Sequence, residues 1–173
     1  FTARLPYLIL SIIVALLVGK YAKRKGLDFF IPAVILLTIP EFLIHAGVVS
    51  TDTALAFCVI LVMISFWEGI NNKQQAIWKY LFFVGVGLGL LAKGPIIIIL
   101  TGPPIFIWLI ISKEFKNLWK SFPWVLGILI TGLIAVPWYY LAEQKTPGFI
   151  DYFIVGEHFK RFLSSGWKGD KYG

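Results

Sequence analysis

The sequence has 173 residues, of which 58% are apolar and only 14% are charged, with a net charge of +7 and a mean hydropathy of +0.82. Ordinary soluble domains carry about 25% charged residues, so this composition excludes a soluble domain and also a disordered or collagen-like chain. A single cysteine, Cys58, excludes a disulfide scaffold. The sequence therefore predicts an integral membrane protein. Because it begins on Phe1 inside apolar sequence, we expect it to be part of a longer protein.

Six apolar stretches follow one another, each close to the roughly 20 residues that a spanning helix needs. They are residues 5–19, 27–46, 48–67, 76–92, 94–111 and 122–141. None has the polar stripe of a helix that lies on a soluble surface. We therefore predict an all-α, polytopic transmembrane bundle of about six spans. It forms one domain over residues 1–141, followed by an outer juxtamembrane segment over residues 142–173.

The short connections on one side of this predicted bundle are rich in lysine and arginine, which indicates the cytoplasmic side. Their basic residues are Lys20, Lys23, Arg24, Lys25, Lys73, Lys79, Lys113, Lys116 and Lys120. The positive charge is then mainly a topology signal, because a nucleic-acid site needs a continuous basic face. We interpret the acids on this side, Asp28, Glu68 and Glu114, as solvated. The predicted location is a bacterial inner membrane, with the other side facing the periplasm or exterior.

Most remaining ionisable residues lie at the outer ends of the predicted spans, where they are functional candidates because charge near hydrocarbon is costly. Asp52, in Ser50-Thr51-Asp52-Thr53, can cap the helix that follows or act as a site carboxylate, and the two roles are compatible. Lys93 lies in a tight Leu-Ala-Lys-Gly-Pro turn. It either snorkels to the interface or presents a fixed cation to a lipid phosphate.

Three further features have structural interpretations. Glu41 and His45 share a helix face at i, i+4, but two ligands are too few for a metal, which favours an interhelical hydrogen bond or a water-lined groove. Gly85 and Gly89 lie inside an apolar span and indicate close helix packing rather than a nucleotide fingerprint. Cys58 lies in the middle of a span and is expected to pack in the core.

The segment after residue 146 differs from the spans because aromatic and charged residues alternate along it. This pattern predicts an amphipathic helix lying in the membrane interface. A helix that only rests on the surface does not account for Glu157 and His158 followed by Arg161. We expect these three residues to lie over the same outer face as Asp52 and Lys93.

Four short motifs in order resemble a known family: Thr51-Asp52-Thr53-Ala54-Leu55, Leu91-Ala92-Lys93-Gly94-Pro95, Pro137-Trp138, and Glu157-His158-Phe159-Lys160-Arg161-Phe162. Together they resemble the membrane glycosyltransferases of the C superfamily, which use polyprenyl-phosphate-linked sugars. The resemblance is to the branch with the lipid A aminoarabinose transferases and, more distantly, the protein O-mannosyltransferases. It covers most of the chain, although each motif alone is weak.

The resemblance implies transfer of a sugar from a polyprenyl phosphate to a hydroxyl of a lipid A-like glycolipid or a protein, at the outer face of the membrane. It implies catalytic roles for Asp52 and Lys93, contact of Lys93, Arg161 and Arg4 with the lipid phosphate, and a divalent metal such as Zn²⁺ or Mg²⁺ on His158 and Glu157. The family's main acidic residue is expected upstream of residue 1, so the segment is expected to be inactive alone.

Two other classes stay open on the sequence. A polytopic transporter or lipid flippase needs ionisable groups near the membrane centre, and the predicted spans have none in their middle. A non-catalytic membrane subunit predicts that the outer polar residues tolerate substitution one at a time.

Overall fold

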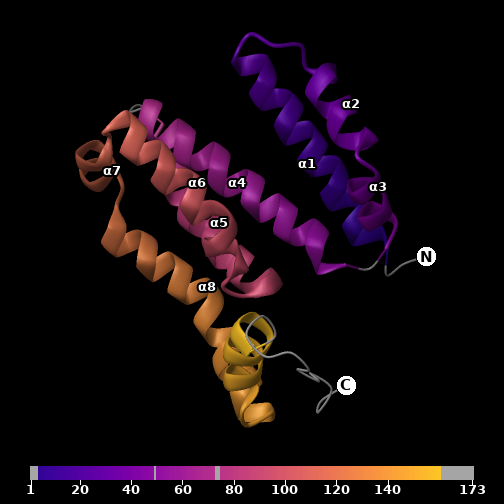
Figure 1. The fold of residues 1–173 in the computed structure, drawn as a ribbon, viewed down its shortest axis with the longest axis vertical. Helices are drawn as coiled ribbons and strands as arrows, with labels where there is room; N and C mark the ends of the chain where they lie inside the picture. The colour runs from indigo at the N-terminus through magenta and orange to yellow at the C-terminus, as the bar shows by residue number, and fades with distance from the viewer. Residues whose placement is uncertain (1–3, 49, 73–74, 161–173) are drawn as a thin grey trace.

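The computed structural model describes residues 4–48, 50–72 and 75–160, and its regular structure there is entirely helical (Figure 1). The elements are α1 (Leu5–Arg24), α2 (Phe30–Thr38), α3 (Pro40–Gly47), α4 (Thr51–Asn71), α5 (Ile77–Lys93), α6 (Ile96–Ser112), α7 (Phe115–Ser121), α8 (Trp124–Lys145) and the π-helix η1 (Asp151–Lys160). The predicted all-α membrane bundle is therefore confirmed.

The number of spans is lower than predicted. Within the described residues, α1, α4 and α8 are each long and apolar enough to cross a membrane, and α6 with α7 makes a fourth span if that pair, bent by 119°, is one broken span. Helices α5 and α6 have 17 residues each, at the short end of the range for spanning helices. The prediction of about six spans is therefore wrong.

The predicted second span is broken at Ile39, which separates α2 from α3. Ile39 is extended, with φ −69° and ψ 116°, and it precedes Pro40. The proline ring disfavours the helical conformation for the residue before it, so the helix stops there and restarts at the proline. The break divides one apolar stretch into helices of nine and eight residues.

Helix α4 lies at the centre of the bundle, with α1 on one side and α5 on the other, and α8 packs against the far side of α5 (Figure 1). Cys58 and Val62 of α4 pack in the core with Ile97 of α6, which confirms the packing role predicted for Cys58. A Cβ atom on Gly85 would lie 2.9 Å from Val62, and one on Gly89 would lie 2.5 Å from Ile97. These glycines therefore permit close helix packing, as predicted.

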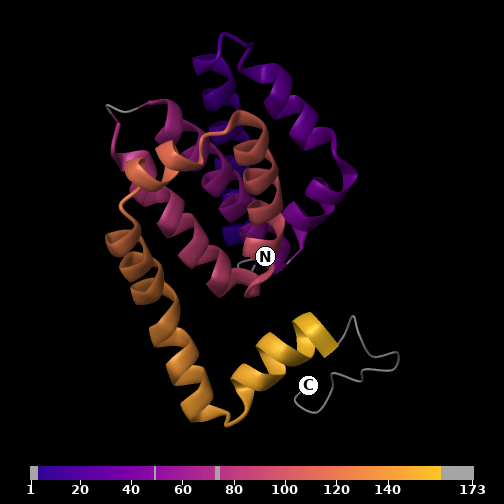
Figure 2. The same cartoon turned by 60° about the vertical axis from the view of Figure 1, so that its left-hand side comes forward.

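The outer segment begins with a sharp turn after α8. Figure 2 shows η1 leaving the end of α8 at an angle and passing below the end of the bundle where α5 meets α6. Aromatic rings line the turn: Trp138 of α8 packs edge-on against Phe149, which precedes η1, with ring centroids 5.4 Å apart, and the ring of Tyr139 lies 6.1 Å from that of Phe153 in η1. The outer segment is thus helical from residue 151 and contacts the end of α8 through these rings.

At the opposite end of the bundle, the connection that contains Lys116 and Lys120 forms the short helix α7, and one expectation about this end is wrong. Glu68 is buried rather than solvated, and it forms an ion pair with Lys25 at 2.9 Å. Lys25 ends α1, so this pair joins α1 to α4. The sequence pattern did not indicate that a charged residue would be buried there.

Candidate functional site

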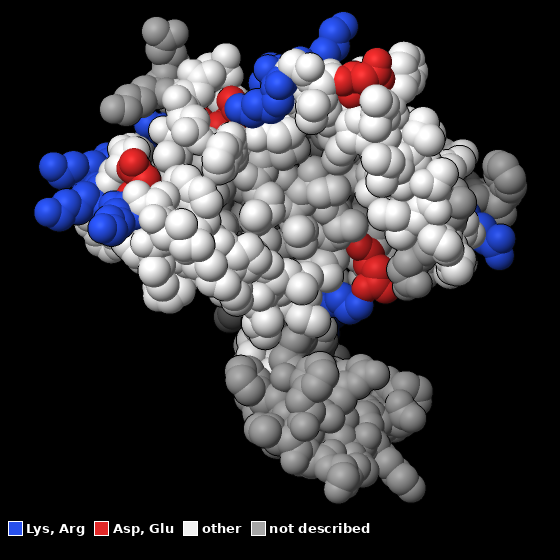
Figure 3. Space-filling view, turned by 45° about the horizontal axis from the view of Figure 1, so that its top comes forward, with Lys and Arg blue, Asp and Glu red and all other residues white. Residues whose placement is uncertain are grey.

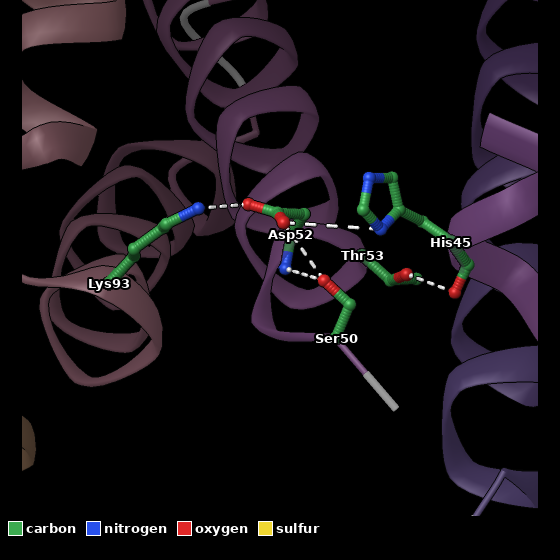
Figure 4. A network of polar contacts seen from close by, with 5 residues as sticks. All are labelled: His45, Ser50, Asp52, Thr53 and Lys93. Carbon is green, nitrogen blue, oxygen red and sulfur yellow. Dashed lines mark hydrogen bonds and ion pairs between the residues drawn. The ribbon is translucent and has the colours of Figure 1, made fainter. Parts of the chain in front are cut away.

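A network of polar side chains joins three helix ends at the Asp52 end of the bundle (Figure 4). The Asp52 carboxylate, in the first turn of α4, accepts a hydrogen bond from the Lys93 ammonium at the end of α5. Its second oxygen, Oδ2, accepts the Ser50 hydroxyl at 2.9 Å and lies 3.9 Å from Nδ1 of His45 on α3. Asp52 and Lys93 are 38% and 39% exposed, so the pair is accessible from outside the protein.

Ser50, rather than Asp52, caps helix α4. Its backbone is extended, and its hydroxyl oxygen accepts a hydrogen bond from the Asp52 amide at 3.1 Å. A serine in this position satisfies one of the amides that the first turn of a helix leaves unpaired. Because Ser50 does the capping, the Asp52 carboxylate is directed toward Lys93. The positive end of the α4 dipole also favours a negative charge at Asp52.

The turn after α5 positions Lys93. Gly94 adopts φ 68° and ψ −149°, a conformation that side-chain-bearing residues rarely adopt, and Pro95 leads directly into α6. The Leu90 carbonyl accepts hydrogen bonds from the Gly94 amide at 2.9 Å and from the Tyr139 hydroxyl of α8 at 2.8 Å. The last turn of α5 is therefore fastened to α8. Sequence reasoning missed Tyr139, although a hydroxyl-bearing ring beside Trp138 in an apolar span was an available signal.

A second link fixes α3 against the start of α4. The Thr53 hydroxyl donates a hydrogen bond to the His45 carbonyl at 3.0 Å, and Thr53 is 2% exposed. This backbone contact places the His45 ring beside Asp52 (Figure 4). The hydrogen bond expected for the Glu41 and His45 pair is not tested, because the Glu41 side chain lies outside the described part of the structure.

An apolar groove of about 570 Å³ starts at this network. Its polar lining residues are His45, Asp52 and Thr53, and its apolar lining comes from α2, α3, α4 and α6: Leu36, Ile39, Phe42, Leu55, Ala56, Val59, Ile60 and Leu100. On α4 the lining runs from Asp52 to Ile60, about 12 Å at the rise of an α-helix. The groove therefore combines a charged end with a long hydrocarbon wall.

The structure places the other predicted site residues with less detail. Arg4 directly precedes α1 and is exposed, and none of its described contacts joins it to Asp52 or Lys93. Glu157 and His158 belong to η1, but their side chains lie outside the described part of the structure, and so does the whole of Arg161. The structure thus brings Asp52 and Lys93 together and leaves the predicted roles of the other four untested.

No metal centre is formed by the described side chains, in which no three His, Cys, Asp or Glu residues come together. His45 and Asp52 supply two groups, and Lys93 already occupies one oxygen of Asp52. An ammonium beside a carboxylate competes electrostatically with a cation for that position. Within the described residues, His45 and Asp52 alone are therefore too few ligands for a metal centre.

The arrangement can bind an amphiphile with an anionic head. The Lys93 ammonium is a charged hydrogen-bond donor at the surface of this network, and ammonium groups are able to contact phosphate. A phosphate beside Lys93 would gain charge-assisted hydrogen bonds, while a hydrocarbon chain could follow the groove along α4.

The chain is similar to known proteins whose names include a lipid phosphate. Residues 1–153 match the family model described as dolichyl-phosphate-mannose-protein mannosyltransferase. The chain is 28% identical over 117 residues to an undecaprenyl phosphate-alpha-4-amino-4-deoxy-L-arabinose arabinosyl transferase of Erwinia tasmaniensis, an alignment covering 66% of this chain and 21% of the relative. It is 22% identical over 162 residues to a Pseudomonas fluorescens protein of the same name, covering 88% and 28%.

A Yersinia pestis protein with that name is 30% identical over 123 residues, covering 66% of this chain and 21% of the relative. No solved structure matches. The chain thus spans between 21% and 28% of the length of these relatives. Because the family match covers most of the sequence, including α1 to α8 and the polar network between them, the chain belongs to the dolichyl-phosphate-mannose-protein mannosyltransferase family.

Proposed function

We propose that this chain forms part of the donor site of a glycosyltransferase that moves a sugar from a polyprenyl phosphate to a hydroxyl of a glycolipid or protein. The observation that carries the proposal is that Asp52, which lines the polar end of an apolar groove, is paired with the Lys93 cation. A polyprenyl phosphate has the matching chemistry, because its phosphate requires a cation and its long chain requires an apolar surface. Membership in the family supports the same function.

In the proposed reaction, the acceptor hydroxyl oxygen attacks the anomeric carbon of the sugar, its proton passes to a carboxylate base, and the bond from that carbon to the phosphate oxygen breaks. The departing polyprenyl phosphate gains negative charge, and Lys93 stabilises that charge. Asp52 holds the lysine in place, since the carboxylate accepts from both Lys93 and Ser50. This arrangement favours a positioning role for Asp52. Two further cations, Arg4 and Arg161, remain proposed phosphate contacts.

The proposed location is the inner membrane of a bacterium, with the Asp52 end of the bundle facing the periplasm. The support is the distribution of basic residues, which are concentrated at the opposite end, around the end of α1 and in α7. Figure 3 shows Lys and Arg gathered toward that end. Labelling of a cysteine introduced at Lys116 or at Ser50 with a membrane-impermeant maleimide tests this orientation, which predicts labelling of intact cells only at position 50.

A divalent metal on Glu157 and His158 also remains a proposal. Imidazole and carboxylate are common ligands for such ions, and a metal would supply further positive charge at the phosphate. His158→Ala is expected to remove bound metal, as measured by elemental analysis of the purified protein, and to lower transfer. Metal content equal to that of the unchanged protein would reject this ligand.

The test of the transferase uses the full-length protein in membranes, supplied with undecaprenyl phosphate-linked 4-amino-4-deoxy-L-arabinose, the sugar lipid in the names of the relatives. Lys93→Met is expected to lower the transfer rate by about 10²–10³-fold, the loss typical when one donor to developing charge is removed. Asp52→Asn is expected to lower it as well, because Lys93 loses its charged partner. Release of undecaprenyl phosphate is the measurement.

Lys79→Met is the matched control, since Lys79 lies on the same helix at its other end. It makes the same charge change and is expected to leave transfer unchanged. Near-normal transfer by both Lys93→Met and Asp52→Asn would reject the site. Translocation of the lipid by the purified protein without any covalent product would instead indicate a flippase. No feature of the described structure favours that alternative.

A further inference from the structure

We propose that a second groove, at the end of the bundle opposite Asp52, binds the headgroup and upper acyl chain of an anionic membrane phospholipid. This basic groove has a volume of about 240 Å³ and lies between α1, α4 and the start of α5. Its lining residues are Leu17, Lys20, Tyr21, Arg24, Ile64 and Trp78. It lies at the other membrane face from the proposed donor site, and the inference does not depend on the transferase activity.

The charge of the groove is positive and locally uncompensated. Lys20 and Arg24 are four residues apart on α1 and therefore share one face of that helix, where both are exposed. Among the described residues no carboxylate forms an ion pair with either of them. The nearby carboxylate, Glu68, is already paired with Lys25 at 2.9 Å. Two cations thus line the groove without an ion pair to any described carboxylate, and an anionic headgroup can supply the opposite charge.

The remaining lining residues match the rest of a phospholipid. Trp78 and Tyr21 are amphipathic rings of the kind that lies at the headgroup level, and the Arg24 guanidinium stacks over Trp78 at 5.7 Å. The apolar lining residues are Ile64 of α4 and Leu17, which lies three residues before Lys20 on α1. An acyl chain attached to a phosphate at Lys20 and Arg24 would therefore continue onto apolar surface.

The surface of α1 stays apolar and exposed from the groove toward the middle of the span. Ile13 and Leu16 are 39% and 52% exposed, as expected of side chains that face lipid. A site for free phosphate would need only the cations, and a topology signal would need neither the groove nor the aromatic rings. The groove chemistry therefore favours a lipid of the surrounding membrane. Basic pockets between spanning helices are a general way to hold anionic lipid headgroups.

The first experiment titrates the delipidated full chain in detergent with dioleoylphosphatidylglycerol, with dioleoylphosphatidylcholine as the uncharged comparison, and counts bound lipids by native mass spectrometry. Replacing both cations, Lys20→Gln with Arg24→Gln, is expected to weaken phosphatidylglycerol binding by about thirtyfold, the factor expected for loss of two cations near a headgroup. Binding of phosphatidylcholine is expected to stay unchanged.

The matched control is Lys23→Gln with Lys116→Gln, which removes the same charge from exposed positions outside the groove. This control is expected to bind phosphatidylglycerol as the unchanged protein does. Equal weakening in both double variants would mean a diffuse charge effect and would reject the site, as would equal affinity of the unchanged protein for the two lipids. Displacement of the lipid by millimolar inorganic phosphate would identify a free-phosphate site and overturn the lipid assignment.

A second measurement does not require the double variant to fold. Phosphatidylglycerol brominated on its acyl chains is expected to quench part of the tryptophan emission of the unchanged protein, and Trp78→Phe is expected to remove that part. Brominated phosphatidylcholine is expected to quench this component weakly. Equal quenching of the Trp78 component by both brominated lipids would reject recognition of the anionic headgroup.

Discussion

Helix α4 carries one lysine-paired carboxylate near each end, and the two pairs lie in opposite surroundings. Asp52, in the first turn, pairs with Lys93, and more than a third of each side chain is exposed at the mouth of the apolar groove. Glu68, near the last turn, pairs with Lys25 and is only 7% exposed. The same chemical pair thus occurs once beside an open groove and once inside the helix packing.

The helix dipole explains why the two pairs differ in what they do. Asp52 lies at the positive end of α4 and has Ser50 as a further donor, so its charge is stabilised even without Lys93. Glu68 lies near the negative end and is buried, and its carboxylate is paired with Lys25. The Lys93–Asp52 pair is therefore suited to meet a ligand, whereas the Lys25–Glu68 pair is a structural link between α1 and α4.

The difference between the two ion pairs is tested most directly by replacing each lysine and measuring the stability of the protein. We expect Lys25→Met to lower the free energy of unfolding by about 2–3 kcal/mol, below the range for a fully buried pair because Lys25 is partly exposed. Lys93→Met is expected to cost less than about 1 kcal/mol, as for exposed pairs. Denaturant unfolding in detergent measures both. Equal losses would show that the two pairs have the same role.

A double variant tests whether an unpaired buried charge causes the loss in Lys25→Met. Lys25→Met with Glu68→Gln is expected to recover part of the lost stability, because no unpaired charge stays buried.

The pH dependence of unfolding tests the same pair. The hydrogen bond to Glu68 raises the pKa of Lys25 above its ordinary value. A raised pKa in the folded state means that this contribution is present at neutral pH and is lost only as the pH rises through that value.

A smaller effect is expected from the cap of α4. Ser50→Ala removes the acceptor for the Asp52 amide and the donor to its carboxylate, which we expect to cost about 1 kcal/mol of stability and to lower transfer by loosening Asp52. Ser50→Thr keeps a capping hydroxyl and is the control. If Ser50→Ala leaves both unfolding and transfer unchanged, Ser50 does not hold the carboxylate.

The smallest effect is expected at Tyr139. Tyr139→Phe removes one hydrogen bond to the Leu90 carbonyl, which we expect to cost about 0.5–1 kcal/mol. Hydrogen exchange of the Gly94 amide, which bonds to the same carbonyl, is expected to speed up. Tyr140→Phe is the control, because that exposed hydroxyl accepts from Gln144 on its own helix. Unchanged exchange in Tyr139→Phe would mean that α8 does not fasten the turn at Lys93.

Particular elements show which parts of the fold the sequence pattern predicted and which it missed. Apolar length predicted the positions of α1, α4 and α8, because each helix buries its own backbone hydrogen bonds whatever its neighbours are. The Leu-Ala-Lys-Gly-Pro turn was predicted at Gly94, because a positive φ after a helix favours glycine. Hydropathy alone treated residues 27–46 as one span, although Pro40 carried the signal for the break at Ile39.

The candidate site was predicted as a set of residues but not as a set of contacts. Asp52 and Lys93 were placed at one membrane face, since both lie at the same end of alternating spans. Their direct pairing, the capping by Ser50 and the support from Tyr139 depend on side-chain distances between helices far apart in sequence. No periodicity carries that information.

The sequence by itself determined that the protein is an all-α membrane protein with polar residues sorted to its two faces, because hydrocarbon excludes both charge and unpaired backbone groups. Only the tertiary structure decided which charges meet. It placed Asp52 with Lys93 beside a groove, and it buried Glu68 with Lys25, although both acids lie on one helix. Pairing is a property of helix packing in three dimensions, so two carboxylate–lysine pairs acquired different surroundings and, we infer, different roles.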